Sequence, residues 1–195
     1  MPNYNAKTIT RIRQNHFDAS LLRDYPKDTL EGGIFMKSYH HILVPIDGSD
    51  YAKQALQHAI DIAKLTGASI TLLNVANMAN IINRFSQMEN TSELTIDELS
   101  ATAQANSTGL LKEFASLVPT SIPVQSLFEL SAPEVSILQE QKALPADLIC
   151  MGRGSKQPLK NFLLGSVSTY VITHAPCPVL LAHDEKKGPY RHILV

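Results

Sequence analysis

Apolar and polar residues along positions 40–183 follow two periods in turn, and this pattern predicts strands that alternate with helices. The segment His-Ile-Leu-Val-Pro-Ile at 41–46 is a short apolar run rich in β-branched residues. Such a run is typical of a strand that is buried on both faces of a sheet. Further strand-like runs lie at 69–75, 124–130, 147–151 and 179–182.

A helix is expected over residues 50–66, because apolar side chains recur there three and four positions apart. These positions are Ala52, Ala55, Leu56, Ala59, Ile60 and Ala63. Ser49 has the chemistry of an N-cap at the start of this helix, and Gly67 suits its end.

Three more helical patterns follow, at 93–117, 133–143 and 166–174. Ser131 is expected as the N-cap of the helix near 133, with Pro133 in its first turn. Residues 77–92 are polar without a clear period and are expected to form a loop. A strand, a helix and a second strand within about 35 residues imply a right-handed crossover and a parallel sheet. The chain is therefore predicted to be a Rossmann-like α/β fold, with a five-stranded parallel open sheet and helices on both faces.

The two ends of the chain differ from this central part. Residues 1–35 have mixed charge and scattered apolar positions, and either a short helix over about residues 6–23 or a poorly ordered tail fits them. The hexapeptide at 39–44 recurs at 190–195, with five of its six residues identical. Chance, the first strand of a second similar domain, and a strand that pairs with a sheet edge or a partner chain all remain open. The expected organisation is an extension at 1–35, a domain at 36–184 and a tail at 185–195.

Composition narrows the class of protein. Hydrophobic residues make up 44% of the 195 residues, enough to fill a core. Because 17 Lys and Arg residues nearly balance 18 Asp and Glu residues, neither nucleic acid nor an anionic membrane is an expected partner. No apolar run approaches the roughly 20 residues that a membrane helix needs. Two cysteines without a CxxC motif favour a cytoplasmic location, and the seven histidines show no metal-ligand spacing.

Candidate binding residues follow the predicted strands, at the edge where parallel sheets bind ligands. Asp47 comes after the first strand, and Gly152, Gly154 and Gly165 come after the fourth. Glycines at a strand–helix junction let backbone N–H groups approach a phosphate, and the helix N-terminus adds a positive dipole end. The alternative is that Gly152 and Gly154 only make a turn.

Other residues of this segment add to the case for phosphate. Ser166 carries a hydroxyl at the helix start, and Arg153, Lys156 and Lys160 supply cations. The segment matches neither GxxxxGK[ST] nor GxGxxG. Since no nucleophile–base pair, GxSxG elbow or carboxylate pair is present in the sequence, a dedicated enzyme is not expected.

The segments that carry these features resemble the universal stress protein family over about residues 38–183. The matching segments are 41–49 (HILVPIDGS), 72–75 (LLNV), 147–152 (DLICMG), 163–168 (LLGSVS) and 174–181 (HAPCPVLL). The resemblance implies the α/β fold of the adenine nucleotide alpha hydrolase-like group, and a homodimer formed through the fifth strand, Val179 to Ala182.

The family resemblance also implies two functional classes. One class binds ATP through a loop of the form Gly-x-x-Gly, nine residues, Gly-Ser or Gly-Thr, whereas the other class lacks this loop. Gly152, Gly165 and Ser166 match the loop, but Ser155 stands at the second glycine, with Gly154 one position earlier. By resemblance, the nucleotide-binding residues are Pro45, Ile46, Asp47, Val75, Met151, Gly152, Arg153, Gly154, Ser155, Gly165, Ser166 and Val167.

The expected function is that of a stress-response protein that binds ATP, with or without Mg²⁺, in a regulatory or switching role. Slow ATP hydrolysis is the most catalysis that this interpretation includes. The alternative is a dimeric interaction module of the same family that binds no nucleotide. An adenylyl-transferring enzyme is a third interpretation, but it requires further catalytic motifs.

Overall fold

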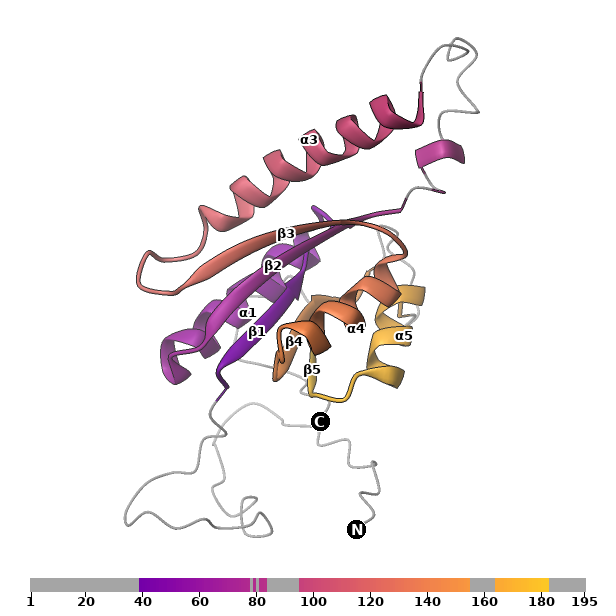
Figure 1. Cartoon of the computed structure of the whole chain (residues 1–195). Helices are drawn as coiled ribbons and strands as arrows, with labels where there is room; N and C mark the ends of the chain where they lie inside the picture. Colours follow the sequence, from indigo (N-terminus) through magenta and orange to yellow (C-terminus); the bar gives the residue numbers. More distant parts are fainter. Residues whose placement is uncertain (1–38, 78, 80, 84–94, 155–163, 183–195) are drawn as a thin grey trace, which may run out of the picture.

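The computed structural model describes residues 39–77, 79, 81–83, 95–154 and 164–182 (Figure 1). These residues form, in chain order, β1 (His41–Pro45), α1 (Asp50–Thr66), β2 (Ser69–Ala76), α3 (Ile96–Ala115), β3 (Val124–Leu130), α4 (Pro133–Ala143), β4 (Leu148–Gly152), α5 (Ser166–His174) and β5 (Val179–Ala182). The predicted helix near 6–23 and the repeated hexapeptide at 190–195 lie outside the described residues.

The described strands form one parallel sheet with the order β3-β2-β1-β4-β5. β1 lies at its centre, with Ile42, Leu43 and Val44 fully buried. These three side chains alternate between the two faces of the sheet, which explains why the run at 41–46 is apolar at successive positions. The five-stranded parallel sheet predicted from the sequence is confirmed.

Helices cover both faces of this sheet (Figure 1). Ile42 and Val44 pack in a core that includes Leu56 of α1 and Phe114 of α3. The opposite core joins Leu43 to residues of α4 and α5, which are Ile137 and Val171. Two cores on one sheet are the expected result of a doubly wound topology.

α1 forms as its sequence predicts. The six positions spaced for one helix face, Ala52 to Ala63, are all buried. The Ser49 hydroxyl accepts a hydrogen bond from the Ala52 N–H at 3.1 Å. Gly67 ends the helix with φ at +76°, and its N–H donates to the Ala63 carbonyl. Both ends of α1 are therefore fixed by local side-chain and backbone chemistry.

Two details differ from the sequence prediction. Ser131 is not the N-cap of α4, because the pairing of β3 with β2 continues to this residue, whose N–H donates to the Ala76 carbonyl, and the helix begins only at Pro133. Ala132 is the N-cap instead, with Pro133 as the first helical residue. In the predicted loop 77–92, residues 79 and 81–83 are helical, and the Ile81 N–H donates to the Asn77 carbonyl. The loop prediction was therefore wrong for these residues.

The helix predicted at 93–117 is shorter, and runs from Ile96 to Ala115. Thr95 is its N-cap, and the Glu98 carboxylate accepts a hydrogen bond from the Thr95 N–H at 2.8 Å. This reciprocal capping fixes the start of α3. None of the helices in the described residues is long and apolar enough to cross a membrane.

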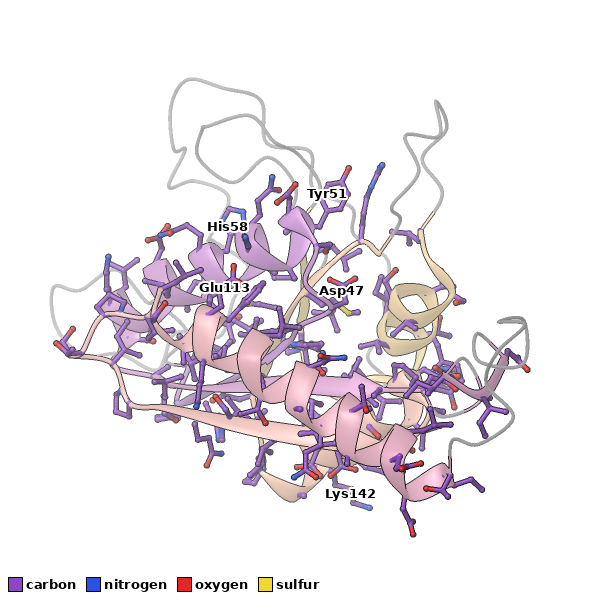
Figure 2. The ribbon with its side chains drawn as sticks, turned by 90° about the horizontal axis from the view of Figure 1, so that it is seen from above. Asp47, Tyr51, His58, Glu113 and Lys142 are labelled. Carbon is purple, nitrogen blue, oxygen red and sulfur yellow. The ribbon has the colours of Figure 1, made fainter. Side chains whose placement is uncertain are left out.

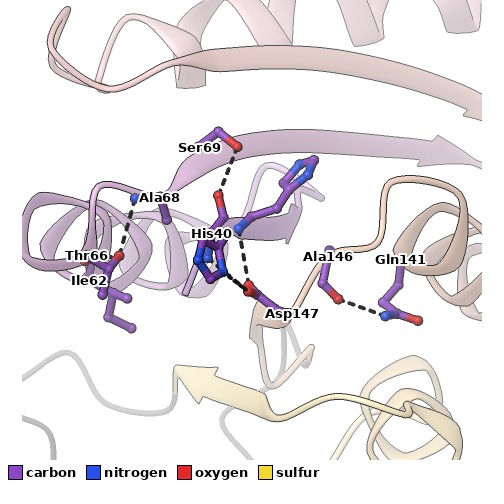
Figure 3. A network of polar contacts seen from close by, with 9 residues as sticks. His40, Ile62, Thr66, Ala68, Ser69, Gln141, Ala146 and Asp147 are labelled. Atoms are coloured by element: carbon purple, nitrogen blue, oxygen red, sulfur yellow. Dashed lines mark hydrogen bonds and ion pairs between the residues drawn. The ribbon is translucent and has the colours of Figure 1, made fainter. Parts of the chain in front are cut away.

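At the amino ends of the strands, Asp147 connects β1 to β4 (Figure 3). Its carboxylate accepts hydrogen bonds from the N–H groups of His40 (2.9 Å) and His41 (3.2 Å), and it lies 3.2 Å from the His40 Nδ1 atom. Partial burial acts to raise the pKa of Asp147, but these hydrogen bonds outweigh it and hold the pKa below its usual value. This contact joins β1 to β4 at the amino ends of the strands, and the candidate site lies at their carboxyl ends.

Candidate functional site

A cavity of about 280 Å³ opens at the carboxyl ends of the central strands. Its walls come from β1, β2, β4, α4 and α5: Pro45, Ile46, Asp47, Ser49, Leu73, Val75, Pro133, Ile137, Met151, Gly152, Gly154, Gly165, Ser166, Val167 and Ser168. The chain leaves β1 through α1 on one face of the sheet and reaches β4 through α4 on the other. The cavity therefore lies where the strand order reverses, which is the usual ligand site of an open parallel sheet.

One wall of the cavity is the turn after β1. The Asp47 Oδ1 atom accepts the Ser49 N–H at 3.0 Å, and Gly48 has φ at +77°, a conformation that favours glycine. Asn74 fixes the base of the turn, since its Nδ2 atom donates to the Ile46 carbonyl at 2.6 Å. The Asp47 carboxylate is exposed, and Figure 2 shows it between α1 and α5. One acidic group is thus held at the rim by its own backbone.

The floor of the cavity is apolar. Leu73, Ile137 and Met151 are buried there, and Val75 packs against the same core. Flat, weakly polar rings bind well to such surfaces, because apolar contact area is removed from water on both partners.

The opposite wall is the segment that connects β4 to α5. The Arg153 carbonyl accepts the Gly165 N–H at 3.0 Å, and the Arg153 N–H donates to the Ala182 carbonyl at 3.2 Å. Gly154 has φ at +64°. A Cβ atom on Gly165 would collide with the Gly154 carbonyl oxygen. The two ends of the segment therefore approach so closely that only glycine fits at position 165.

Gly152 is also required by packing. A Cβ atom there would lie 2.8 Å from the Tyr51 Cβ atom and 3.0 Å from the Tyr51 carbonyl carbon. The end of β4 is in this way pressed against the first turn of α1. This close approach brings the cavity wall to within reach of Ser49 and Asp47, which line the same space.

The N-terminus of α5 faces the cavity without a side-chain cap from the described residues. Gly165 is the N-cap, and the first helical hydrogen bond runs from the Thr169 N–H to the Gly165 carbonyl at 2.9 Å. The N–H groups of Ser166 and Val167 have no acceptor within the helix, as in the first turn of any α-helix. Both residues line the cavity, so these donors and the positive end of the helix dipole are available to an anion.

Most of the residues predicted from the sequence meet at this cavity. Ten of the described candidates line it: Pro45, Ile46, Asp47, Val75, Met151, Gly152, Gly154, Gly165, Ser166 and Val167. Arg153 also lies in the described part of the chain, but its side chain does not line the cavity. Its guanidinium lies over the Tyr51 ring instead, 5.2 Å from the ring centroid. Ser155, Lys156 and Lys160 lie outside the described residues.

Sequence reasoning missed five lining residues: Ser49, Leu73, Pro133, Ile137 and Ser168. In the sequence, Leu73 and Ile137 have the pattern of ordinary core positions, and Pro133 has the pattern of a residue in the first turn of a helix. The segment 163–168 contained Ser168, but nothing in the sequence showed that its hydroxyl is buried and bonded across the site.

The described residues contain no group of three or more His, Cys, Asp or Glu side chains that could hold a metal ion. Cys150 is fully buried, and burial raises the pKa of its thiol well above the usual value. A thiol in this environment stays protonated and is a poor nucleophile.

Comparisons with known proteins place these features in a family. The sequence profile of the Universal stress protein family matches residues 38–183. A universal stress protein of Methanocaldococcus jannaschii is 35% identical over 149 residues, which cover 76% of this chain and 85% of the relative. The structure of the universal stress protein UspA from Lactobacillus plantarum is 25% identical with a TM-score of 0.56, and the match covers 75% of this chain and 99% of that one. A second structure, described as a universal stress protein in complex with cAMP, has a TM-score of 0.55 at 20% identity, and the match covers 75% of this chain and 98% of that one.

Proposed function

Because the chain belongs to the universal stress protein family, we propose that it binds ATP in the cavity at the carboxyl ends of β1, β2 and β4. Its role is that of a regulatory stress-response protein that changes its conformation or its choice of partner with bound nucleotide. The observation that carries this proposal is the N-terminus of α5, which no side chain of the described residues caps, opposite an apolar floor with Asp47 at the rim.

Each part of an adenine nucleotide has a complementary part of the cavity. The apolar floor of Leu73, Val75 and Met151 suits the adenine ring. The Asp47 carboxylate suits a ribose hydroxyl, as acidic residues do in dinucleotide-binding folds. The N–H groups of Ser166 and Val167 suit phosphate oxygens. Mg²⁺ enters the proposal only as the ion that accompanies the phosphates.

The left-handed conformation of Gly154 supports phosphate binding despite the serine at position 155. In this proposal Gly154 makes the turn that lets the backbone approach the phosphates, one position before the second glycine of the family's loop.

The remaining nucleotide-binding residues are those predicted from the sequence. Arg153 contributes through its backbone rather than its guanidinium, which stacks on Tyr51. At 20% identity, the structure described as a complex with cAMP shares the fold of this chain and nothing more. The proposal therefore rests on the chain's own cavity.

The proposal extends to assembly, location and chain organisation. The family profile at 38–183 falls inside the proposed domain at 36–184. An extension at 1–35 precedes this domain, and a tail at 185–195 follows it. The protein works in the cytoplasm as a binding protein, not as an enzyme. It forms a homodimer through β5, which lies at one end of the strand order.

The backbone register of β5 supports this dimer and gives its test. The Pro178 carbonyl accepts the N–H of Ile149 in β4, and the Ala182 carbonyl accepts the N–H of Arg153, the residue directly after β4. In a parallel ladder the residues between them alternate, so Leu181 directs its N–H and carbonyl to the outer edge. Leu181→Pro removes that outer donor without removing a bond to β4. Light scattering should give a dimer for the natural chain and a monomer for this variant; a natural chain that is monomeric at high concentration would refute the dimer.

Nuclear magnetic resonance of the ¹⁵N-labelled chain tests the binding proposal. ATP should shift the amide signals of Gly165, Ser166 and Val167, and adenosine should shift mainly that of Val75. The amide of Thr71, at the other end of the sheet, serves as the internal control. A titration with ATP and Mg²⁺ that moves none of the cavity signals would remove the proposal.

A second candidate function is the dimeric interaction module that binds no nucleotide. The observation in its favour is that the family's second loop glycine is replaced by Ser155, while the Arg153 side chain lies outside the cavity. Replacing Ser155 by glycine separates the two candidates. A large gain in ATP affinity in Ser155→Gly indicates an impaired natural loop, whereas unchanged tight binding supports the turn at Gly154.

A further inference from the structure

Ser168 is a buried serine in the first turn of α5, with 1% of its surface exposed. Its Oγ atom lies 2.9 Å from the Arg153 carbonyl and 3.0 Å from the Gly165 carbonyl. The Gly165 contact is local to the helix turn, but the Arg153 contact joins residues 15 positions apart. A hydroxyl has one proton to donate, so these two carbonyls share it or compete for it.

The Arg153 carbonyl is the point where three elements meet. It accepts the Gly165 N–H as well as the Ser168 hydroxyl, while the Arg153 N–H donates to the end of β5 at Ala182. Ser168 therefore completes a set of hydrogen bonds that joins the end of β4, the end of β5 and the start of α5. The same helix start presents the Ser166 and Val167 N–H groups to the cavity.

We propose that Ser168 is a positioning residue for the phosphate end of the site. Its hydroxyl holds the start of α5 against the exit of β4, and so fixes where the N–H groups of Ser166 and Val167 lie relative to Asp47. Ser168 acts through these neighbours, and its hydroxyl does not itself bind the ligand. This inference rests on the proposed nucleotide site, and it adds a residue that determines how strongly the phosphates are held.

The variant Ser168→Ala is expected to fold, because it leaves both carbonyls with a donor. The Arg153 carbonyl keeps the Gly165 N–H, and the Gly165 carbonyl keeps the Thr169 N–H. No buried acceptor is orphaned, and alanine is no larger than serine. The loss is confined to the hydroxyl's contacts with the Arg153 and Gly165 carbonyls, of which only the Arg153 contact crosses the loop ends.

Ser136→Ala is a matched control. Ser136 is also 1% exposed and lies in α4, between the lining residues Pro133 and Ile137. In the described part of the chain its hydroxyl has no hydrogen-bond partner. Removing that hydroxyl therefore tests the loss of a buried serine near the cavity without the loss of the Arg153 contact.

Calorimetry with ATP and with adenosine separates positioning from general damage. Ser168→Ala should weaken ATP binding by about five-fold or more and change adenosine binding by less than about two-fold, while Ser136→Ala alters neither. A merely structural role moves both ligands together. Equal weakening of both ligands, or unchanged ATP binding in Ser168→Ala, would overturn the inference.

Hydrogen exchange at the Gly165 amide keeps the test independent of the proposed function. That N–H is bonded to the Arg153 carbonyl, which the Ser168 hydroxyl helps to hold in place. Its exchange rate should therefore rise about five-fold in Ser168→Ala and stay the same in Ser136→Ala. A natural chain that binds neither ATP nor adenosine would refute the proposed function. The positioning role would then be decided by this exchange rate alone, and an unchanged rate would refute it.

Discussion

Replacing Gly165 by alanine should weaken ATP binding through one steric contact. Gly165 has φ at −66° and ψ at 159°, which alanine adopts readily, so the backbone conformation itself adds no strain. The added methyl group would overlap the Gly154 carbonyl oxygen, and it would lie 3.1 Å from the Gly154 carbonyl carbon and 3.2 Å from the Arg153 carbonyl oxygen. All three are backbone atoms, so no flexible side chain can move aside.

The size of the effect follows from these contacts. Because carbon–oxygen contacts are comfortable only near 3.5 Å, the start of α5 must move by on the order of 1 Å. Overpacking of this kind costs roughly 1–3 kcal/mol of stability. If the N–H groups of Ser166 and Val167 lose a comparable part of their interaction with phosphate, ATP affinity falls by about ten-fold or more.

The assay is calorimetry with ATP, together with unfolding in urea. Gly109→Ala is the matched control, since a Cβ at this glycine of α3 meets nothing within 4 Å. It should stabilise the chain by roughly 0.5–1 kcal/mol and leave ATP binding unchanged. If Gly165→Ala binds ATP as tightly as the natural chain, the reasoning from the close contact of the loop ends is refuted.

Three further predictions concern single positions. Gly154→Ala should lose about 1 kcal/mol of unfolding free energy in urea, because φ at +64° disfavours an L side chain; a variant as stable as the natural chain would contradict this. Since the folded pKa of Asp147 lies below the ordinary 3.8, its contribution is complete above that value and is lost as the pH falls through the lower, folded pKa. Urea midpoints measured downward from pH 5 should therefore fall less steeply in Asp147→Asn, and equal slopes would refute the role of the His40 and His41 contacts. Cys150 should resist iodoacetamide at pH 8 until urea unfolds the chain, because burial keeps its thiol protonated; rapid labelling of the native chain would argue against that burial.

Those parts of the fold that depend on local signals could be predicted from the sequence. The face of α1, its Ser49 cap and its Gly67 end all follow from residues close together in the chain. β3 and α5 begin and end where the pattern placed them. The cap of α4 failed because Ser131 is held by a partner in another strand, Ala76, and no local pattern contains that information.

The candidate site shows the same division. Asp47 and the glycines could be predicted because strand ends and glycine spacing are visible in the sequence. The Arg153 side chain could not be placed, since its orientation depends on Tyr51 in a different element. Leu73 and Ile137 have the pattern of ordinary core residues, and only the packing of α4 on the sheet brings them to the cavity.

The central claim, that this chain binds an adenine nucleotide, is tested most directly by analysing the purified protein itself. The protein would be purified without added nucleotide and denatured, and released small molecules would be identified by chromatography and mass spectrometry. We predict an adenine nucleotide, ATP or AMP, at close to one equivalent per chain. A protein that releases no nucleotide and gives no heat of binding with added ATP and Mg²⁺ would contradict the account.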